Sequence, residues 1–169
     1  DHLGRVAYTA KSRRADLGGL ERFCTNFGYE PMAFDAADAA GTAVYHTNVM
    51  MTVATDFAMV GLSLISSPAR RQEVSDRLAG TGRDVIELSG EQVARFAGNA
   101  IELQGRAGRL LVLSRTAFDS LTQAQKAIIE RSCALLPVDV PTIELAGGSV
   151  RCMIAGIHLN QRPMMAGDG

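Results

Sequence analysis

The chain has 169 residues, with 17 lysines and arginines against 18 aspartates and glutamates, so its net charge is −1. A near-neutral chain has no basic surface with which to hold a phosphate backbone, so we expect no nucleic-acid partner. Hydrophobic residues make up 47% of the sequence, which excludes a disordered segment and is typical of one globular domain with a sizeable core.

Neither a membrane span nor a secretory signal is expected. No basic segment precedes an apolar one in the manner of a signal peptide. The longest apolar stretch, residues 49–65, is interrupted by Thr52, Thr55 and Asp56. A carboxylate in the middle of a span costs about 2.5–3.5 kcal/mol on insertion scales. The three cysteines include no CxxC pair and are too few for a disulfide framework or a zinc knuckle, which favours the reducing cytoplasm.

The first predicted elements are a strand at residues 5–9, an amphipathic helix at 16–27 and a strand at 30–36. Two longer stretches then repeat the order strand, strand, helix, strand, with a period of about fifty residues. The first full unit comprises residues 46–51, 57–62, 68–78 and 84–88. The second comprises residues 99–103, 109–113, 122–134 and 141–145. Thr122 is the expected N-cap of the helix at 122–134 in the second full unit.

The opening elements therefore form a unit that lacks its first strand, and residues 151–159 resemble the first strand of a further unit. The fold class that we expect is α/β, an incomplete array of two full units and two partial ones. Such an array leaves strand edges without neighbours. The alternative is an α+β domain whose elements alternate without true repetition.

Cys152 is the candidate nucleophile among the three cysteines. Cys24 and Cys133 each lie on a helical stripe of apolar residues, where a buried core thiol is usual. The stripe around Cys24 comprises Leu17, Leu20, Phe23 and Phe27. Cys152 follows the Gly-Gly-Ser loop 147–149 and stands beside Arg151. A neighbouring cation and exposed backbone amides favour the thiolate that nucleophilic catalysis requires. A third core cysteine is the alternative.

His46 is the candidate catalytic histidine. In the repeat register, His46, Asn99 and Cys152 all fall at the beginning of a first strand. If the units pack with these strands innermost, the three side chains converge on one cleft. His2 lies at the first residues of the chain, and His158 lies six residues beyond Cys152, roughly 20 Å along a strand. A structural role for His46 is the alternative.

Other polar features have simpler explanations. The segment 78–82 contains a GxG pattern, but it follows a predicted helix, which indicates a helix C-cap and no phosphate loop. Asp35, Glu87 and Glu144 recur one step inside the last strand of each unit. We interpret these three carboxylates as solvent-facing.

Three strings carry a resemblance to a known family. They are Tyr45-His46-Thr47-Asn48-Val49-Met50-Met51, Phe96-Ala97-Gly98-Asn99, and the stretch 142–153 with its Gly147-Gly148-Ser149-Val150-Arg151-Cys152-Met153. The chain closely resembles the guanidino-group modifying, or pentein, superfamily over nearly its whole length. The nearest branch is the arginine-deiminase-related, amidinotransferase-like proteins, which include citrulline-utilisation hydrolases. The resemblance implies a five-bladed α/β propeller of ββαβ units.

By this resemblance Cys152 is the nucleophile and His46 is the general acid and base. Asn48, Asn99 and Arg151 are the candidate substrate-binding residues, and the alternative for Asn99 is that its segment 96–99 only makes a turn. The thiolate attacks a guanidino or ureido carbon, and the histidine protonates the departing amine or ammonia. The same histidine then activates the water that hydrolyses the Cys-linked intermediate. The implied partner is a small guanidino or ureido amino acid of the citrulline or arginine type, and no cofactor or metal is implied.

The sequence departs from the family pattern in four places. The acidic residue that orients the histidine normally lies in a Glu-Gly-x-Gly-like stretch, which is expected upstream of Asp1. Ala146 occupies the position of a third glycine, and Gly156 replaces an expected glutamate near the site. Asn48 is neutral where arginine deiminases tend to carry an acidic residue, which favours citrulline over arginine.

Two other functions are compatible with the same strings. An amidinotransferase would use the same residues but would resolve the intermediate with an amine. A non-catalytic pentein-fold binding protein, like the ribosome anti-association factors, would share the fold alone, and the presence of both Cys152 and His46 argues against it. We expect residues 1–169 to be a single pentein domain, the C-terminal portion of a longer five-unit propeller. Alone, this portion should be nearly inactive and should associate with its missing N-terminal portion or with copies of itself.

Overall fold

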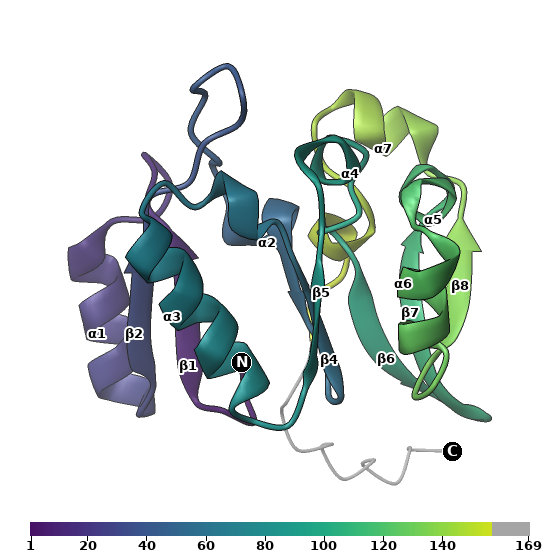
Figure 1. The fold of residues 1–169 in the computed structure, drawn as a ribbon, viewed down its shortest axis with the longest axis horizontal. Coiled ribbons are helices and arrows are strands. Elements are labelled where there is room, and N and C mark those ends of the chain that lie inside the picture. Colours follow the sequence, from purple (N-terminus) through teal and green to yellow (C-terminus); the bar gives the residue numbers. More distant parts are fainter. Residues whose placement is uncertain (157–169) are drawn as a thin grey trace, which may run out of the picture.

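The computed structural model describes residues 1–156 and contains three small β-sheets that stand side by side (Figure 1). The first sheet is a parallel pair of β1 (Val6–Ala10) and β2 (Glu30–Phe34). Helix α1 (Leu17–Phe27) connects the two strands. This arrangement matches the predicted unit without a first strand.

The second sheet contains a complete unit. Strand β3 (Met51–Val53) is antiparallel to β4 (Phe57–Val60). Helix α3 (Pro68–Ala79) then leads to β5 (Asp84–Glu87), which is parallel to β4. The order of strands across the sheet is β3-β4-β5.

The third sheet repeats this topology. Strand β6 (Ile101–Gly105) is antiparallel to β7 (Gly108–Ser114). Helices α5 (Arg115–Ser120) and α6 (Gln123–Ile129) lead to β8 (Ala134–Val138), which is parallel to β7. The predicted α/β class and the ββαβ order are therefore confirmed.

Short helical turns occupy the connections between these elements. They are α2 (Thr47–Met50), η1 (Leu62–Leu64), α4 (Gly90–Ala94), α7 (Pro141–Leu145) and η2 (Val150–Met153). No helix within residues 1–156 combines the length and the apolar character that crossing a bilayer requires.

The third unit along the chain, which is the second of the two full units predicted from the sequence, differs from its prediction at its end. Thr122 is the N-cap of α6, as predicted, and forms a capping box with Gln125. The helix ends at Ile129, however, and the last strand of the unit is β8. The predicted strand at 141–145 is wrong, because those residues form α7. The sequence pattern concealed β8 because Pro137 lies within it, yet β8 is an edge strand, where one side needs no ladder hydrogen bond.

The predicted first strands also differ from the structure. Of residues 46–51, only Met51 lies in a strand, since 47–50 form α2. In the third unit β6 begins at Ile101, two residues later than predicted. The expected strand at 151–159 is wrong in its first part, where η2 lies. Its last residues, with His158, lie outside the described residues. The described array thus comprises two full units and one partial unit, without the second partial unit.

Helix α1 buries less of its apolar stripe than predicted. Leu20 and Cys24 are buried, but Leu17, Phe23 and Phe27 are 49%, 44% and 59% exposed. The helix lies at one end of the row of sheets, so only one of its sides is covered (Figure 1). The apolar spacing identified the helix correctly but overestimated the width of its buried face.

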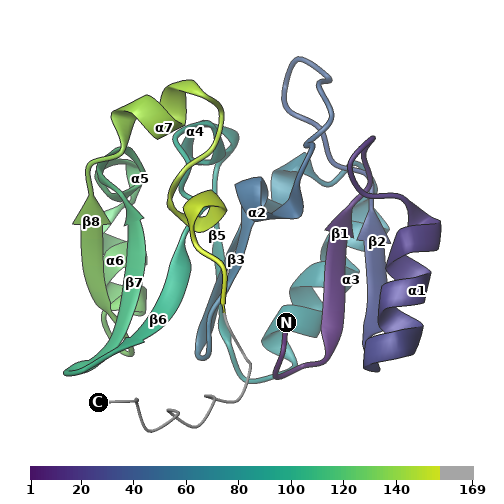
Figure 2. The same ribbon diagram turned by 180° about the vertical axis from the view of Figure 1, so that it is seen from behind.

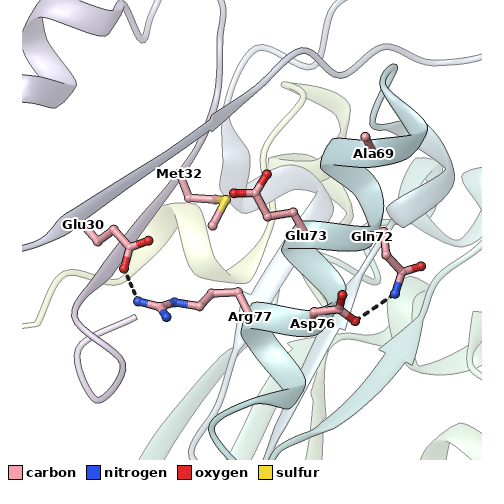
Figure 3. Close-up of a pocket in the computed structure, with 7 residues that line it drawn as sticks. All are labelled: Glu30, Met32, Ala69, Gln72, Glu73, Asp76 and Arg77. Carbon is pink, nitrogen blue, oxygen red and sulfur yellow. Dashed lines mark hydrogen bonds and ion pairs between the residues drawn. The ribbon is translucent and has the colours of Figure 1, made fainter.

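Arginine side chains join neighbouring units. In the groove between β2 and α3, about 530 Å³ in volume, Arg77 forms an ion pair with Glu30 (Figure 3). Arg131, just after α6, pairs with Asp84 of β5 at 2.6 Å. Each arginine extends from one unit to the last strand of the preceding unit. Exposed ion pairs contribute only about 0.2–1 kcal/mol to the free energy of unfolding. We therefore interpret this groove as the boundary between two units.

Candidate active site

The three cysteines have different environments. Cys24 and Cys133 are buried, as predicted, whereas Cys152 is exposed in η2. Burial, together with a hydrogen bond between its thiol and the Glu102 carboxylate, raises the pKa of Cys133 to about 11. That thiol is therefore almost fully protonated at neutral pH. Among the described residues, Cys152 is the accessible thiol.

The side chain of Asn99 contacts Cys152 directly. Its Nδ2 lies 3.2 Å from Cys152 Sγ and donates to Asn48 O at 2.7 Å, while its Oδ1 accepts from Arg151 N at 3.1 Å. Asn99 is only 1% exposed. The buried Asn99 amide therefore contacts the sulfur from the protein side of the site. The predicted convergence of positions 99 and 152 is therefore present, with the amide engaged by the protein itself.

A close approach between two backbones places Asn99. A Cβ atom on Gly98 would come within 2.6 Å of Val49 O and of the Met50 carbonyl carbon. The buried hydroxyl of Thr52 donates to Gly98 O at 2.8 Å. These contacts fix the Phe96-to-Asn99 segment against the second unit, and this packing requires glycine at position 98.

Replacing Gly98 with alanine should destabilise the protein strongly and displace Asn99. The added methyl group would meet backbone atoms, which cannot rotate away, and overpacking of this kind costs about 3 kcal/mol. Chemical denaturation of Gly98→Ala measures the loss in the free energy of unfolding. Gly90→Ala is the matched control, because a Cβ at Gly90 meets nothing within 4 Å. Equal stability of the two variants would contradict the close approach.

The segment that begins at Tyr45 forms the other side of the site. The Tyr45 hydroxyl donates to Gly147 O, and its ring centroid lies 4.9 Å from that of His46. Asn48 Nδ2 lies 3.8 Å from Cys152 Sγ, within reach of a hydrogen bond to sulfur. Asn48 Oδ1 is buried and has no hydrogen-bond partner among the described residues. Both views show α2 beside the segment that carries η2 (Figures 1 and 2).

A cleft of about 590 Å³ opens next to these residues. Thr47, Asn48 and Arg151 contribute to its wall from the site, and Tyr8 and Glu102 contribute from strands of neighbouring units. Its size lies within the range of about 300–1,000 Å³ that is usual for small-molecule sites. No three or more His, Cys, Asp or Glu side chains within residues 1–156 are arranged as metal ligands.

Three of the five predicted site residues contact one another, whereas His46 and Cys152 are not among the residues that line the cleft. Cys152, Asn48 and Asn99 are in contact, and His46 is the N-cap residue of α2, with its ring against Tyr45. Arg151 lines the cleft, but its guanidinium donates to a backbone carbonyl of its own segment at 2.9 Å. The guanidinium of this arginine is therefore engaged by its own chain.

Sequence reasoning missed two contacts of this region. Tyr45 precedes His46 in the sequence, but nothing in the pattern indicated its hydrogen bond to the loop that leads to Cys152. Asp35 and Glu87 are exposed, as predicted. The prediction for Glu144 is wrong, since it is half-buried in α7 and accepts from the hydroxyl of Ser149.

Comparison with known families identifies the chain. A family model described as "N,N dimethylarginine dimethylhydrolase, eukaryotic" matches residues 1–159. The chain belongs to this family. The resemblance to the guanidino-group modifying (pentein) superfamily is thereby confirmed. No curated relative matches the sequence significantly.

This member of the dimethylarginine dimethylhydrolase family shares its fold with larger proteins of known structure. ArgZ, an arginine dihydrolase from the ornithine-ammonia cycle in cyanobacteria, matches with a TM-score of 0.70 and 13% identity over 90% of this chain and 22% of ArgZ. AgrE, in a ternary complex with ornithine and NAD+, matches with a TM-score of 0.72 and 14% identity over 97% of this chain and 22% of AgrE.

The N-terminal domain of ArgZ, bound to product, matches with a TM-score of 0.68 and 14% identity. The match covers 90% of this chain and 51% of that domain. At such identities the likeness establishes the fold alone. The chain spans about half the length of the ArgZ domain and less than a quarter of the full enzymes.

Proposed function

We propose that this protein is a cysteine-dependent hydrolase that acts on a small guanidino or ureido compound through a covalent intermediate on Cys152. The observation that carries the proposal is the exposed Cys152 sulfur with the amides of Asn99 and Asn48 at 3.2 and 3.8 Å. The two amides contact the sulfur from the protein side, and Cys152 is exposed to solvent. The family supports this reading, and a variant of the ArgZ N-terminal domain is known with a covalently bound reaction intermediate.

Each residue has a defined role in the proposed reaction. The Cys152 thiolate forms a bond from sulfur to the guanidino or ureido carbon, which becomes tetrahedral. Protonated His46 donates its proton to the departing amine or ammonia as the carbon–nitrogen bond breaks. Neutral His46 then takes a proton from water, whose oxygen attacks the same carbon. The carbon–sulfur bond breaks, and the thiolate and the protonated histidine are restored.

A small substrate panel tests this function. We expect the full-length protein to release ammonia, an alkylamine or ornithine from at least one of citrulline, arginine and N,N-dimethylarginine without an added acceptor. Activity that appears only with an acceptor amine would assign amidinotransfer instead. The absence of turnover with every compound would contradict the hydrolase proposal.

Asn48 favours a neutral substrate within this reaction. Its side-chain amide can donate to a ureido oxygen, and its unpartnered Oδ1 can accept from the ureido NH2. A cationic guanidinium pairs better with a carboxylate, since charge-assisted hydrogen bonds are about twice as strong as neutral ones. We therefore propose citrulline as the preferred substrate over arginine.

Exchange of Asn48 for aspartate should reverse this preference. We expect a higher kcat/KM for citrulline in the unaltered protein and a shift of about tenfold towards arginine in Asn48→Asp. Measuring both substrates with both proteins gives the ratio directly. Asn26→Asp, an identical change on the exposed side of α1, is the control. An unaltered protein that already hydrolyses arginine faster would refute the assignment.

We also propose that residues 1–169 form one domain within a closed pentein propeller, completed by a further portion of the protein that supplies the acidic partner of His46. The greater length of the related structures and the exposed Phe23 and Phe27 on α1 support this arrangement. Amide hydrogen exchange in α1 should then be slower in the full-length protein than in residues 1–169 alone. Equal exchange rates would contradict closure at this helix.

A further inference from the structure

Glu144 joins the segment of the candidate nucleophile to the third unit. Thr116, in α5, donates from Oγ1 to Glu144 Oε2 at 2.7 Å. Ser149 donates from Oγ to Glu144 Oε1 at 3.2 Å. The two carboxylate oxygens thus bind hydroxyl groups from two different elements, and Ser149 is fully buried.

Ser149 is directly connected to the backbone of the candidate nucleophile. Its carbonyl accepts from Cys152 N at 3.1 Å and so closes the first turn of η2. Between Glu144 and Ser149 the chain passes through Gly147, with φ of +88°, and Gly148. A loop with two glycines does not hold one conformation by itself, so contacts from outside the loop must fix it.

Two other contacts hold the same segment. Tyr45 binds Gly147 O from the second unit, and Asn99 binds Arg151 N. Among the side-chain contacts described for this loop, the one made by Glu144 ties it to α5. Removing Glu144 would therefore leave the loop attached to Asn99 and Tyr45 but without its side-chain tie to α5.

We propose that Glu144 is a positioning residue for Cys152: its carboxylate, held by Thr116, fixes Ser149 and thereby sets the sulfur against the amide of Asn99. The inference rests on the proposed function only in taking Cys152 as the nucleophile. The opposing explanation is that Glu144 merely stabilises α7, since an acidic residue in the first turn of a helix is favourable in itself.

Glu91 provides a matched control for that explanation. It is an exposed glutamate in the first turn of α4, a helix of the same length as α7 that precedes the third unit. Glu91→Ala therefore removes the general benefit of an acidic first turn without touching the loop. Glu144→Gln is the conservative variant, because a hydroxyl can accept from an amide as well as donate to one.

The test measures the rate at which iodoacetamide alkylates Cys152 in the full-length protein, together with kcat and KM. We expect Glu144→Ala to slow alkylation about threefold, as the sulfur loses its amide donor. We expect kcat to fall about 10- to 100-fold, the cost of a nucleophile misplaced by about 1 Å, with a smaller change in KM. Glu144→Gln should recover most of both rates, and Glu91→Ala should match the unaltered protein.

The double variant Glu144→Ala/Ser149→Ala should be alkylated no more slowly than either single variant, because both substitutions remove the same contact.

Parental alkylation and kcat in Glu144→Ala would overturn the proposal, and so would an equal effect of Glu91→Ala. If Glu144→Ala does not fold, Thr116→Val removes one hydroxyl only, and parental rates in that variant would also overturn it. Alkylation needs no substrate, so a failed substrate panel with slower alkylation in Glu144→Ala would refute the proposed function and leave the positioning role supported.

Discussion

Replacing Cys152 with alanine should abolish turnover, with a loss of about 10⁶ in kcat, the size found when a nucleophile is removed from a catalytic unit. In the proposed reaction the Cys152 sulfur forms the covalent bond, and neither amide beside it can replace it. The loss should not come from unfolding, because Cys152 is exposed and a smaller side chain there leaves no cavity. Steady-state assays of the purified variant measure the effect.

Mass spectrometry supplies a second measurement for the same residue. Unaltered protein quenched with acid during turnover should carry the substrate carbon on the peptide that contains Cys152, and Cys152→Ala should carry none. Cys24→Ala is the control, because that thiol is buried in α1, away from the site. A Cys152→Ala variant within tenfold of parental activity would show that another group forms the covalent bond.

Replacing His46 with alanine should lower kcat by about 10² to 10⁴, the usual contribution of a general acid and base. His46 is half-exposed at the start of α2 and makes no side-chain cap, so its removal should leave the fold intact. Circular dichroism and the rate of Cys152 alkylation should both stay close to the parental values. The measurement is kcat with the best substrate of the panel.

Added imidazole distinguishes a chemical role of His46 from a structural one. A small imidazole in solution can carry the proton that the missing side chain no longer carries, so it should restore part of the lost rate in His46→Ala. If His46 had only a structural role, imidazole would not restore the activity of His46→Ala. Parental turnover in His46→Ala would mean that the acid and base lie elsewhere in the protein.

The sequence predicted the units of the fold better than their ends. Apolar spacing and turn residues identified both full units, because these signals depend on neighbours along the chain. The prediction failed at β8, where an edge position tolerates Pro137, and at α2, a single helical turn. Thr47 anchors that turn by accepting from Ala10 N at 2.9 Å, a contact between segments far apart in the sequence.

The candidate site was predictable to a similar extent. The repeat register brought Asn99 and Cys152 together correctly, because equivalent positions of adjacent units lie close in space. It could not reveal Glu144, which the pattern placed on an exposed strand. That error followed directly from assigning 141–145 to a strand. In a strand successive side chains alternate between the two faces of the sheet, whereas in a helical turn they follow a period of about 3.6 residues, so the Glu144 side chain has a different direction.

The bonds of Asn99 connect the second unit to the segment of Cys152, since they reach Asn48 O in one direction and Arg151 N in the other. The Asn99 side chain makes both hydrogen bonds only while the second unit and the segment of Cys152 are packed against it. The reactivity of the Cys152 thiol therefore reports on these two contacts. We expect mild denaturant or pressure that separates the second unit from the third to lower the alkylation rate of Cys152 while every sheet is still intact.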